Sequence, residues 1–493
     1  MHVIVLLTLA IVATHVARGF FRVLVDPLWH IPGPTSARWT RLWEMREVRK
    51  GHFEKANIKL HGRYGSIVRI APSTYSISDP GAIRQIYGAG SSFTKAPFYY
   101  AFGTADKPRS DLFSELDNPR HAIKRKKVSS LYSMSALVNY ETPIDGVTEK
   151  LCQSLDRFCT TGEAFDFPGW MQFYAFDVIG AITVGDPFGF LQAGKDWNGI
   201  LRAIHESMVY GSIIGIVPEL HPVLSKITQT LKIEIPFDLV SNYIVKNITG
   251  HTVAAKPSTG NLGTDFLTLL LTRQSEGKID DTDLFNSLGA NIAAGSDTTA
   301  ISLSAFFYHI LRSPEAFSTL RNEVDSVMRA KVIGEPVAYS EAQRMQYMQA
   351  CIKEALRLHP ATGYPLLRVV PEGGGSIAGQ FFPEGTRVGM NPWVLHQNED
   401  IFGPQPGLFR PERWLGAKDA VSVMSNHLLT FGAGARTCIG KNISLLEMSK
   451  LIPQLVRRFD FQLEQPGSDW KTNTAWFVKQ EFRCVVKKRE DMR

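Results

Sequence analysis

The feature that most constrains this chain is a glycine-rich loop around one cysteine, Phe431-Gly-Ala-Gly-Ala-Arg-Thr-Cys438-Ile-Gly440. Glycines on both sides of the cysteine let the backbone turn tightly and approach a flat cofactor closely. The next residues, 441–447, have a helical pattern, so Cys438 should lie near a helix N-terminus, where free amide hydrogens and the helix dipole stabilise a thiolate. A lone cysteine is most often an ordinary buried thiol. These neighbours instead make Cys438 a candidate cofactor ligand.

The loop resembles the signature of the cytochrome P450 superfamily, Phe-x-x-Gly-x-Arg-x-Cys-x-Gly, at all five fixed positions. The resemblance implies that Cys438 binds the iron of haem b as a thiolate, with Phe431, Arg436 and Gly440 around the same cofactor. Arg436 would add positive charge for an acidic group such as a haem propionate. A zinc site is excluded as a serious rival, because no second cysteine or histidine lies at ligand spacing from Cys438.

A long helical pattern is predicted from Asp281 to about Leu311, with N-cap candidates at 280–282. It closes at Ser313-Pro314, a cap followed by the proline that opens the next helix. At 1.5 Å per residue this helix would be about 45 Å long, so we expect it to cross the core.

Within this helix, the segment 294–299 (Ala-Gly-Ser-Asp-Thr-Thr) interrupts an apolar face with small and polar residues. Taken alone, it indicates a kink at a Gly/Ser pair with solvent-facing Asp and Thr. It also resembles the oxygen-activation segment of the P450 family. That resemblance implies that the helix opens at Gly295 and that Asp297 and Thr298 relay protons to dioxygen. Family members that only rearrange peroxides tend to lack this acid–alcohol pair.

Two further motifs match the family. Glu354 and Arg357 are three residues apart, a spacing that alone indicates a surface ion pair. They resemble the family's Glu-x-x-Arg pair, and Arg413 in Pro-Glu-Arg-Trp would complete a buried structural triad behind the haem. His121 and Arg125, one helical turn apart, resemble a clamp for the haem propionates, although the family often has Trp at the first position.

Other basic residues also fit haem or partner binding. Arg368 matches another propionate-binding arginine of the family. Four lysines could form a basic face that docks an acidic electron donor, or simply a solvated helix face: Lys124, Lys126, Lys127 and Lys441.

Composition places the chain among globular proteins of one main domain. No linker or charge block divides the 493 residues, of which 44% are hydrophobic. The net charge is +7, but no basic stripe interleaved with aromatics favours nucleic acid. Five cysteines without metal-ligand spacing indicate a reducing compartment.

Residues 1–25 are predicted to form a single-pass membrane anchor, with the haem-binding domain at 26–493. The apolar run from Val3 to Ala17 is followed by Arg18 and Arg22, a positive flank that predicts a cytosolic body. A cleaved signal peptide is the alternative, which would need basic residues before the run and a small residue where His15 stands. Residues 31–34 (Ile-Pro-Gly-Pro) read as a stiff hinge or as an ordinary turn.

The resemblance implies a mainly α fold with a small β region, a triangular helical prism whose long central helix lies over the haem. It implies a monomeric monooxygenase of the endoplasmic reticulum membrane that inserts one atom of dioxygen into a lipophilic small molecule. NADPH–cytochrome P450 reductase would supply the electrons. Phrases at 31–34, 389–393 and 409–415 look like the fungal secondary-metabolite branch.

Candidate pocket segments come from family position, with core packing as the alternative: 98–102, 290–299, 361–366 and 476–477. A haem-thiolate isomerase or dehydratase of the same fold, and a non-enzymatic haem sensor, are the rival functions.

Overall fold

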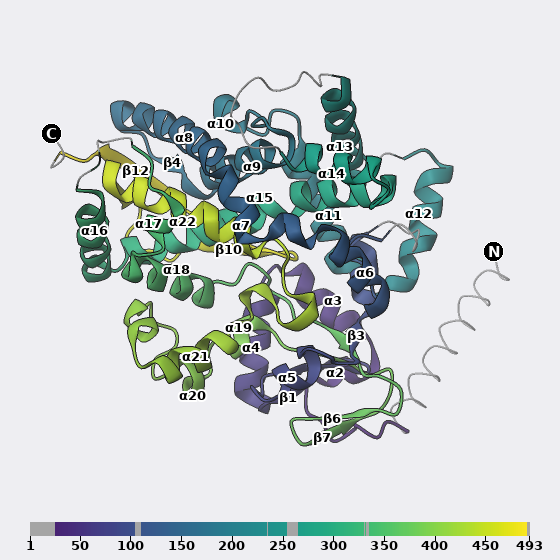
Figure 1. Cartoon of the computed structure of the whole chain (residues 1–493). Helices are drawn as coiled ribbons and strands as arrows, with labels where there is room; N and C mark the ends of the chain where they lie inside the picture. The colour runs from purple at the N-terminus through teal and green to yellow at the C-terminus, as the bar shows by residue number, and fades with distance from the viewer. Residues whose placement is uncertain are drawn as a thin grey trace, which may run out of the picture.

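Helices form most of the molecule, and a smaller lobe holds strands together with α2, α4 and α5 (Figure 1). The computed structural model describes residues 25–103, 110–233, 235–253, 265–329, 331 and 335–490. The predicted class, mainly α with a small β region, is confirmed. The predicted membrane anchor lies almost wholly outside the described residues.

The long predicted helix is present as α15, Asp281–Leu311. Asp280 caps it by accepting a hydrogen bond of 2.8 Å from the amide of Asp283, whose side chain accepts from the Asp280 amide in return. The next helix, α16, begins at Pro314 after the cap residue Ser313, as the sequence predicts. Most of α15 beyond Thr299 is buried, so this helix crosses the core.

The other helices surround α15, and α9 packs along it. Their bounds are α2 Thr35–Trp39, α3 Leu42–Arg49, α4 Phe53–Tyr64, α5 Ala82–Tyr87, α6 Asn118–Val128, α7 Met134–Leu137, α8 Glu141–Thr161, α9 Phe167–Val184, α10 Phe190–Ala193, α11 Ile200–Ile214, α12 His221–Thr230, α13 Pro236–Val253, α14 Phe266–Ser275, α16 Pro314–Met328, α17 Tyr339–Ala342, α18 Gln346–Leu358, α19 Pro392–Leu395, α20 Glu399–Phe402, α21 Lys418–Asn426 and α22 Lys441–Arg458. Short 3-10 helices are η1 Pro97–Phe102, η3 Ser129–Tyr132, η4 Val138–Tyr140, η5 Pro218–Leu220, η6 Pro411–Leu415, η7 Leu429–Phe431 and η8 Gly434–Arg436.

Among the described residues, the main sheet has the order β1-β2-β8-β5-β3, in which only the β2–β8 pair is parallel. Smaller sheets are β4-β12-β9, β10-β11 and β6-β7. The strands are β1 Ile67–Ala71, β2 Thr74–Ile77, β3 Thr94–Lys95, β4 Phe165–Asp166, β5 Arg368–Val369, β6 Gly375–Ile377, β7 Gln380–Phe382, β8 Arg387–Gly389, β9 Phe459–Leu463, β10 Lys471–Thr474, β11 Val478–Glu481 and β12 Arg483–Lys488.

The segment at 31–34 is held against the body. The amide of Arg69 in β1 donates to the carbonyl of Pro32 at 2.8 Å. The guanidinium of Arg69 donates to Asp26 at 2.6 Å and to the carbonyl of Leu28 at 2.7 Å. A Cβ on Gly33 would overlap the Arg69 carbonyl oxygen, so glycine is required for this close approach.

No single helix in the described ranges is long and apolar enough to cross a membrane. Helix α11 together with the segment Pro218–Thr230 meets the length and composition criteria, but the two are bent by 116° at their junction.

Candidate functional site

The cysteine loop is a tight turn between η7 and α22. The amide of Cys438 donates to the carbonyl of Phe431 at 2.8 Å, which closes the loop on itself. Gly432 and Gly434 have φ values of 70° and 64°, a region that favours glycine. A Cβ on Gly434 would also overlap the carbonyl oxygen of Tyr87, so this residue brings the loop against α5.

Cys438 lies just before the N-terminus of α22, as predicted. Of the five cysteines it alone is exposed, while the others are buried or half-buried. Burial by the surrounding protein raises the pKa of its thiol, whereas the amides of Gly440 and Lys441 and the charges of Arg125 and Lys441 lower it. The Cys438 thiol therefore faces a space that is enclosed by protein. The amides of Gly440 and Lys441 and the charged side chains of Arg125 and Lys441 lie close to it.

Helix α15 faces this loop. The hydroxyls of Thr299 and Ser444 lie 2.8 Å apart, which joins α15 directly to the first turns of α22. On the same stretch of α15, Ala294 is exposed although its neighbours along the helix are mostly buried. The acid–alcohol segment and the cysteine loop therefore belong to one site.

The predicted triad is assembled behind the loop and is buried. Glu354 accepts from Arg357 at 2.8 and 2.9 Å and from Arg413 at 2.9 Å. The indole of Trp414 donates to the other Glu354 oxygen at 2.9 Å, a contact that the sequence analysis did not include. Burial opposes ionisation, but hydrogen bonding to Arg357 and the charges of Arg357 and Arg413 hold the pKa of Glu354 below its usual range. The carbonyl of His396 accepts from Arg357 at 2.9 Å, so the triad fixes the chain that leads to the loop.

The predicted propionate-binding residues converge from three parts of the chain. Arg125 donates to the carbonyl of Thr437 at 2.8 Å, beside Cys438. Arg436 donates to the carbonyl of Glu115 at 2.6 Å, and Arg368 to that of Leu367 at 2.9 Å.

His121 is uncharged in this cluster. It is buried, and burial followed by the charges of Arg436, Lys95 and Arg125 lowers its pKa to about 3. It is therefore a neutral hydrogen-bonding group at physiological pH. A neutral His121 agrees with the family resemblance, because the family often has Trp, an uncharged hydrogen-bond donor, at this position.

Lys95 is a member of this cluster that the sequence analysis missed. Its side chain is buried and donates to the carbonyl of Phe113 at 2.5 Å. Burial and the nearby charges of Arg368 and Arg436 lower its pKa well below the usual range. A buried Lys in strand β3 carries no sequence motif, and only the fold brings it to Arg368.

These residues fit haem. Among the described residues, Lys95, Arg125, Arg368 and Arg436 form no ion pair with a carboxylate, and their mutual repulsion would be relieved by acidic groups. Two propionates would supply such groups, and the Cys438 thiol beside a helix N-terminus is placed to serve as the iron ligand.

Asp297 and Thr298 are adjacent on α15 but differ in their partners. The hydroxyl of Thr298 donates to the carbonyl of Ala294 at 2.9 Å. Asp297 is buried and forms an ion pair with Lys479 at 3.0 Å. The expected opening of the helix at Gly295 is wrong, because α15 is continuous through this residue, where a Cβ would lie 2.5 Å from Ile179 of α9. Gly295 thus allows the two helices to pack closely.

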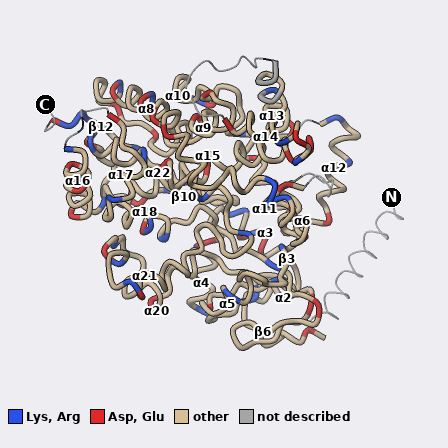
Figure 2. Tube along the Cα trace, viewed as in Figure 1, with Lys and Arg blue, Asp and Glu red and all other residues tan. Residues whose placement is uncertain are grey.

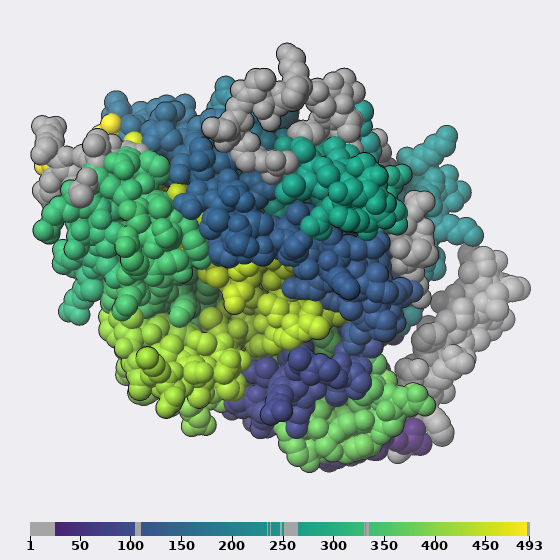
Figure 3. Space-filling model, in the orientation of Figure 1, coloured from purple at the N-terminus to yellow at the C-terminus, as the bar shows by residue number. Residues whose placement is uncertain are grey.

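The four predicted docking lysines differ in exposure. Lys124 pairs with Glu115 at 3.1 Å, and Lys127 pairs with Asp283. Lys126 and Lys441 are exposed. Figure 2 shows basic and acidic residues interspersed along the trace around α6. In Figure 3 the yellow-green surface between the blue and purple segments belongs to the chain around the cysteine loop.

Three of the predicted pocket segments come together. Phe98 and Tyr364 stack with ring centroids 4.8 Å apart, and Trp476 lies 5.7 Å from Phe98. All three side chains are buried in one cluster that also contains Ile301 of α15. The aromatic side chains pack on each other, in agreement with the core-packing alternative.

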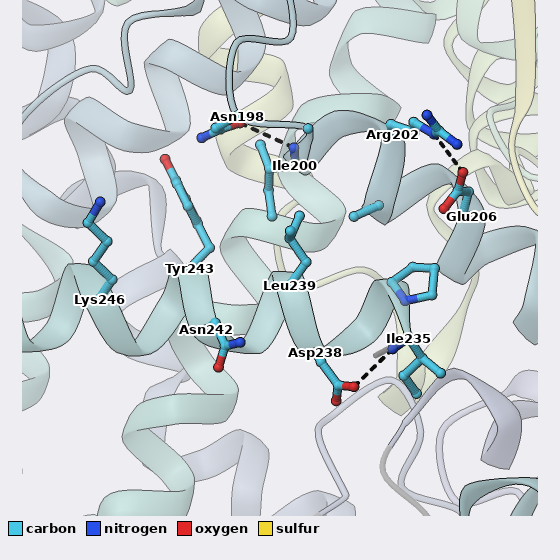
Figure 4. Close-up of a pocket in the computed structure, with 13 residues that line it drawn as sticks. Asn198, Ile200, Arg202, Glu206, Ile235, Asp238, Leu239, Asn242, Tyr243 and Lys246 are labelled. Carbon is cyan, nitrogen blue, oxygen red and sulfur yellow. Dashed lines mark hydrogen bonds and ion pairs between the residues drawn. The ribbon is translucent and has the colours of Figure 1, made fainter. Parts of the chain in front are cut away.

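A separate hollow of about 560 Å³ lies between α11 and α13. Figure 4 shows the ion pair of Arg202 and Glu206 on one side and Tyr243 and Lys246 on the other. It contains none of the predicted site residues.

Comparison with known proteins gives a consistent result. The family model described as cytochrome P450 matches residues 32–487. A pisatin demethylase of Fusarium vanettenii is 40% identical over 98% of this chain and 93% of its own length. Cytochrome P450 monooxygenase cicH of Emericella nidulans is 35% identical over 93% of each chain, and monooxygenase gsfF of Penicillium aethiopicum is 34% identical over 92% of each. The resemblance to the fungal secondary-metabolite branch is confirmed.

Proposed function

The chain belongs to the cytochrome P450 family, and from this premise we propose that it is a haem-thiolate monooxygenase of fungal secondary metabolism, with Cys438 as iron ligand. It would insert one oxygen atom of dioxygen into a lipophilic small molecule. The observation that carries the proposal is the joining of the acid–alcohol helix to the cysteine helix through Thr299 and Ser444. Haem would supply dioxygen binding and activation when held by Cys438.

In this proposal the site residues have separate roles in holding the haem and in transferring protons. Cys438 would hold the iron, and the basic cluster of Lys95, Arg125, Arg368 and Arg436, with neutral His121, would hold the propionates. Phe431 and Gly440 would shape the loop. Thr298 would pass protons that Asp297 supplies, since each turnover consumes two protons and two electrons as the second oxygen atom becomes water.

The first experiment is the carbon monoxide difference spectrum of the reduced protein beside Cys438→Ala. We expect a strongly red-shifted Soret band that the variant lacks. A histidine-type spectrum in well-folded wild-type protein would refute the proposal.

We propose that electrons arrive from NADPH through cytochrome P450 reductase at the face of α6. Lys126 on α6 and Lys441 at the start of α22 are both exposed, and Ile123 on α6 is 61% exposed. Lys126→Glu with Lys441→Glu should raise the KM for reductase several-fold, while the matched change Lys226→Glu on α12 leaves it unaltered. Equal KM values for the double variant and the wild type would show that the reductase docks at another face.

We propose that the enzyme is monomeric and acts at the endoplasmic reticulum membrane, with its body in the cytosol. Support comes from α12 and the residue after it, where Val223, Ile227 and Leu231 follow one another at four-residue spacing and are 46–64% exposed. Val223→Ser with Ile227→Ser should weaken flotation with phospholipid vesicles.

The substrate proposal is a lipophilic intermediate of natural-product synthesis. Pisatin, which the relatives' name identifies as their substrate, and 7-ethoxycoumarin are suitable first probes. Product that forms only with NADPH, reductase and dioxygen would support the oxygenase. Product without them would favour an isomerase or dehydratase, and haem binding without any turnover would favour a sensor.

A further inference from the structure

Glu44 of α3 is a buried carboxyl that has no part in the roles proposed above. It is 2% exposed, and its Oε1 accepts a hydrogen bond from the hydroxyl of Tyr364. Within the described part of the chain, its carboxyl group has no other hydrogen-bond partner. The buried carboxylate of Glu354, by contrast, accepts from three side chains. Because a carboxylate can accept about four hydrogen bonds, Glu44 has acceptor positions that these residues leave unfilled.

The two arginines whose charges act on Glu44 are bonded elsewhere. Arg41 forms an ion pair with Glu219 at 3.0 Å, and Arg387 donates to the carbonyl of Pro72 at 3.4 Å. Burial raises the pKa of Glu44 to about 7, although the bond from its tyrosine partner and the charges of Arg387 and Arg41 lower it. A buried carboxyl that is so incompletely compensated is unusual in a folded protein and indicates a group kept for binding.

The ring that bonds Glu44 belongs to the aromatic cluster on the predicted substrate side. Tyr364 stacks on Phe98 with ring centroids 4.8 Å apart, and the ring of Tyr99 lies 5.5 Å from that of Phe98. The ammonium group of Lys95, a member of the basic cluster, lies 4.4 Å from the centroid of Tyr99. A continuous series of rings therefore connects Glu44 with the residues that would hold the haem propionates.

The segment 361–366 makes the same connection along the main chain. Tyr364, near its middle, bonds Glu44. Leu366, at its end, lies against the cysteine loop, where a Cβ on Gly432 would be 3.9 Å from its Cδ1. Leu366 is also half-buried, whereas Tyr364 is buried. A molecule bound along this segment would have one end near the cysteine loop and the other near Glu44.

Resting on the proposed oxygenase function, we propose that Glu44, with Tyr364, is the polar end of the substrate site and selects aromatic molecules that carry a hydroxyl group remote from the oxidised carbon. The aromatic cluster supplies ring faces on which a flat molecule packs. The hydroxyl of the ligand donates to the Glu44 carboxylate, beside the bond from Tyr364. An analogue without this donor is bound less tightly, because it buries the carboxylate without filling its acceptor positions.

The test measures ligand binding to the haem-loaded full chain by equilibrium dialysis, which needs neither electrons nor turnover. The probes are 4-phenylphenol, biphenyl, and 4-methoxybiphenyl, which keeps the oxygen but lacks its proton. The variant is Glu44→Gln, which can still accept from Tyr364 but offers an amide N–H in place of the second acceptor. The matched control is Glu47→Gln in the next turn of α3, where the carboxylate pairs with Lys50 at 2.7 Å.

We expect wild type to bind 4-phenylphenol at least about tenfold more tightly than either of the other probes, since hydrogen bonds to charged groups are the stronger ones. In Glu44→Gln the preference over 4-methoxybiphenyl should fall to within about twofold, because an amide N–H can donate to either ligand oxygen. Glu47→Gln should keep the wild-type preference.

Equal Kd values of wild type for the three probes would overturn the proposal, and this result does not depend on a variant that folds. A loss of affinity in Glu44→Gln that is the same for all three probes would show that the carboxyl only fixes Tyr364. That outcome would also overturn the proposal.

Incubation of the same probes with NADPH, reductase and dioxygen separates this inference from the proposed function. A hydroxyl preference that depends on Glu44, without any dioxygen-dependent product, would refute the oxygenase function and support the recognition by Glu44. Dioxygen-dependent product from biphenyl, with equal Kd values for the three probes, would support the oxygenase function and overturn the recognition.

Discussion

Glu447 on α22 is a carboxyl with no role in the proposed chemistry. It is 0% exposed, and neither of its oxygens has a hydrogen-bond partner among the described residues. Burial alone raises its pKa well above the usual 4.5. The folded protein therefore keeps this proton over a pH range where the unfolded chain has lost it, and stability falls as pH rises through that range.

We predict that Glu447→Gln removes this pH-dependent penalty. The penalty is about 1.4 kcal/mol for each pH unit between 4.5 and the native pKa. The variant should equal wild type near pH 4 and exceed it in unfolding free energy at pH 8, as measured by urea titration. The exposed Glu163→Gln serves as control, and a difference between Glu447→Gln and wild type that does not grow with pH would contradict this reading.

The triad gives a prediction of opposite sign. Glu354→Gln leaves Arg357 and Arg413 buried without their counter-ion, which should cost about 3–5 kcal/mol of unfolding free energy. The matched control is Glu412→Gln in η6, the short helix that also carries Arg413; the exposed Glu412 carboxylate accepts from the hydroxyl of Tyr347 at 2.7 Å. It should cost below about 1 kcal/mol. Equal losses of unfolding free energy in the two variants would show that the buried Glu354 stabilises the fold no more than the exposed Glu412 does.

Residues were predictable where their chemistry is encoded locally. Cys438, Arg436 and the pair Glu354–Arg357 stand in short motifs with fixed spacing. Lys95 and Lys479 carry no such pattern. Strand pairing brings Lys95 to Arg368, and the packing of β11 on α15 brings Lys479 to Asp297. The partner of Asp297 was likewise beyond the sequence, because it comes from 182 residues further along the chain.

At the scale of elements, Gly295 sets the distance between α9 and α15. A Cβ there would lie 2.5 and 2.7 Å from two atoms of Ile179. Gly295→Ala should lower the unfolding free energy by about 1–2 kcal/mol, since overpacking outweighs the roughly 1 kcal/mol gained from alanine in a helix. Adding Ile179→Val, which removes the closer Cδ1 atom but keeps Cγ1 at 2.7 Å, should recover part of the loss.

Gly289→Ala on the same helix is the control for this prediction. Its added Cβ would meet only the flexible end of Ile244 at 3.2 Å. It should therefore be neutral or stabilising by up to about 1 kcal/mol. If both alanine variants behave alike in thermal unfolding, the packing explanation is wrong.

Elements with strong end signals were predicted well. Asp280 and Ser313-Pro314 mark the bounds of α15 and the start of α16. The hairpin β6–β7 has no such signal in the sequence, and it turns at Ala378 and Gly379, which both adopt positive φ. The stretch before Phe431 holds helices of four to nine residues, which are too short to show a helical period in the sequence.

In the whole molecule, the proposed site is enclosed by segments distant in sequence. The smaller lobe contributes Lys95 and Arg368, and the helical part contributes Cys438, Arg125 and α15. The chain enters this assembly at residues 26–34, which lie on β1.

We predict that Arg69→Met detaches residues 26–34 from β1. Arg69 is 2% exposed and bonds both Asp26 and Leu28, so its loss leaves a carboxylate and a carbonyl without their shared donor. The unfolding free energy should fall by about 3 kcal/mol, and limited proteolysis should cut between residues 26 and 34 at least several times faster than in wild type. Asp26→Asn keeps an oxygen that can accept from Arg69, and it should show a much smaller rise in cleavage. If Arg69→Met is cut in that segment at the wild-type rate, the backbone bond to Pro32 and the close approach of Gly33 suffice to hold it. The attachment would then reside in the main chain and not in the buried ion pair.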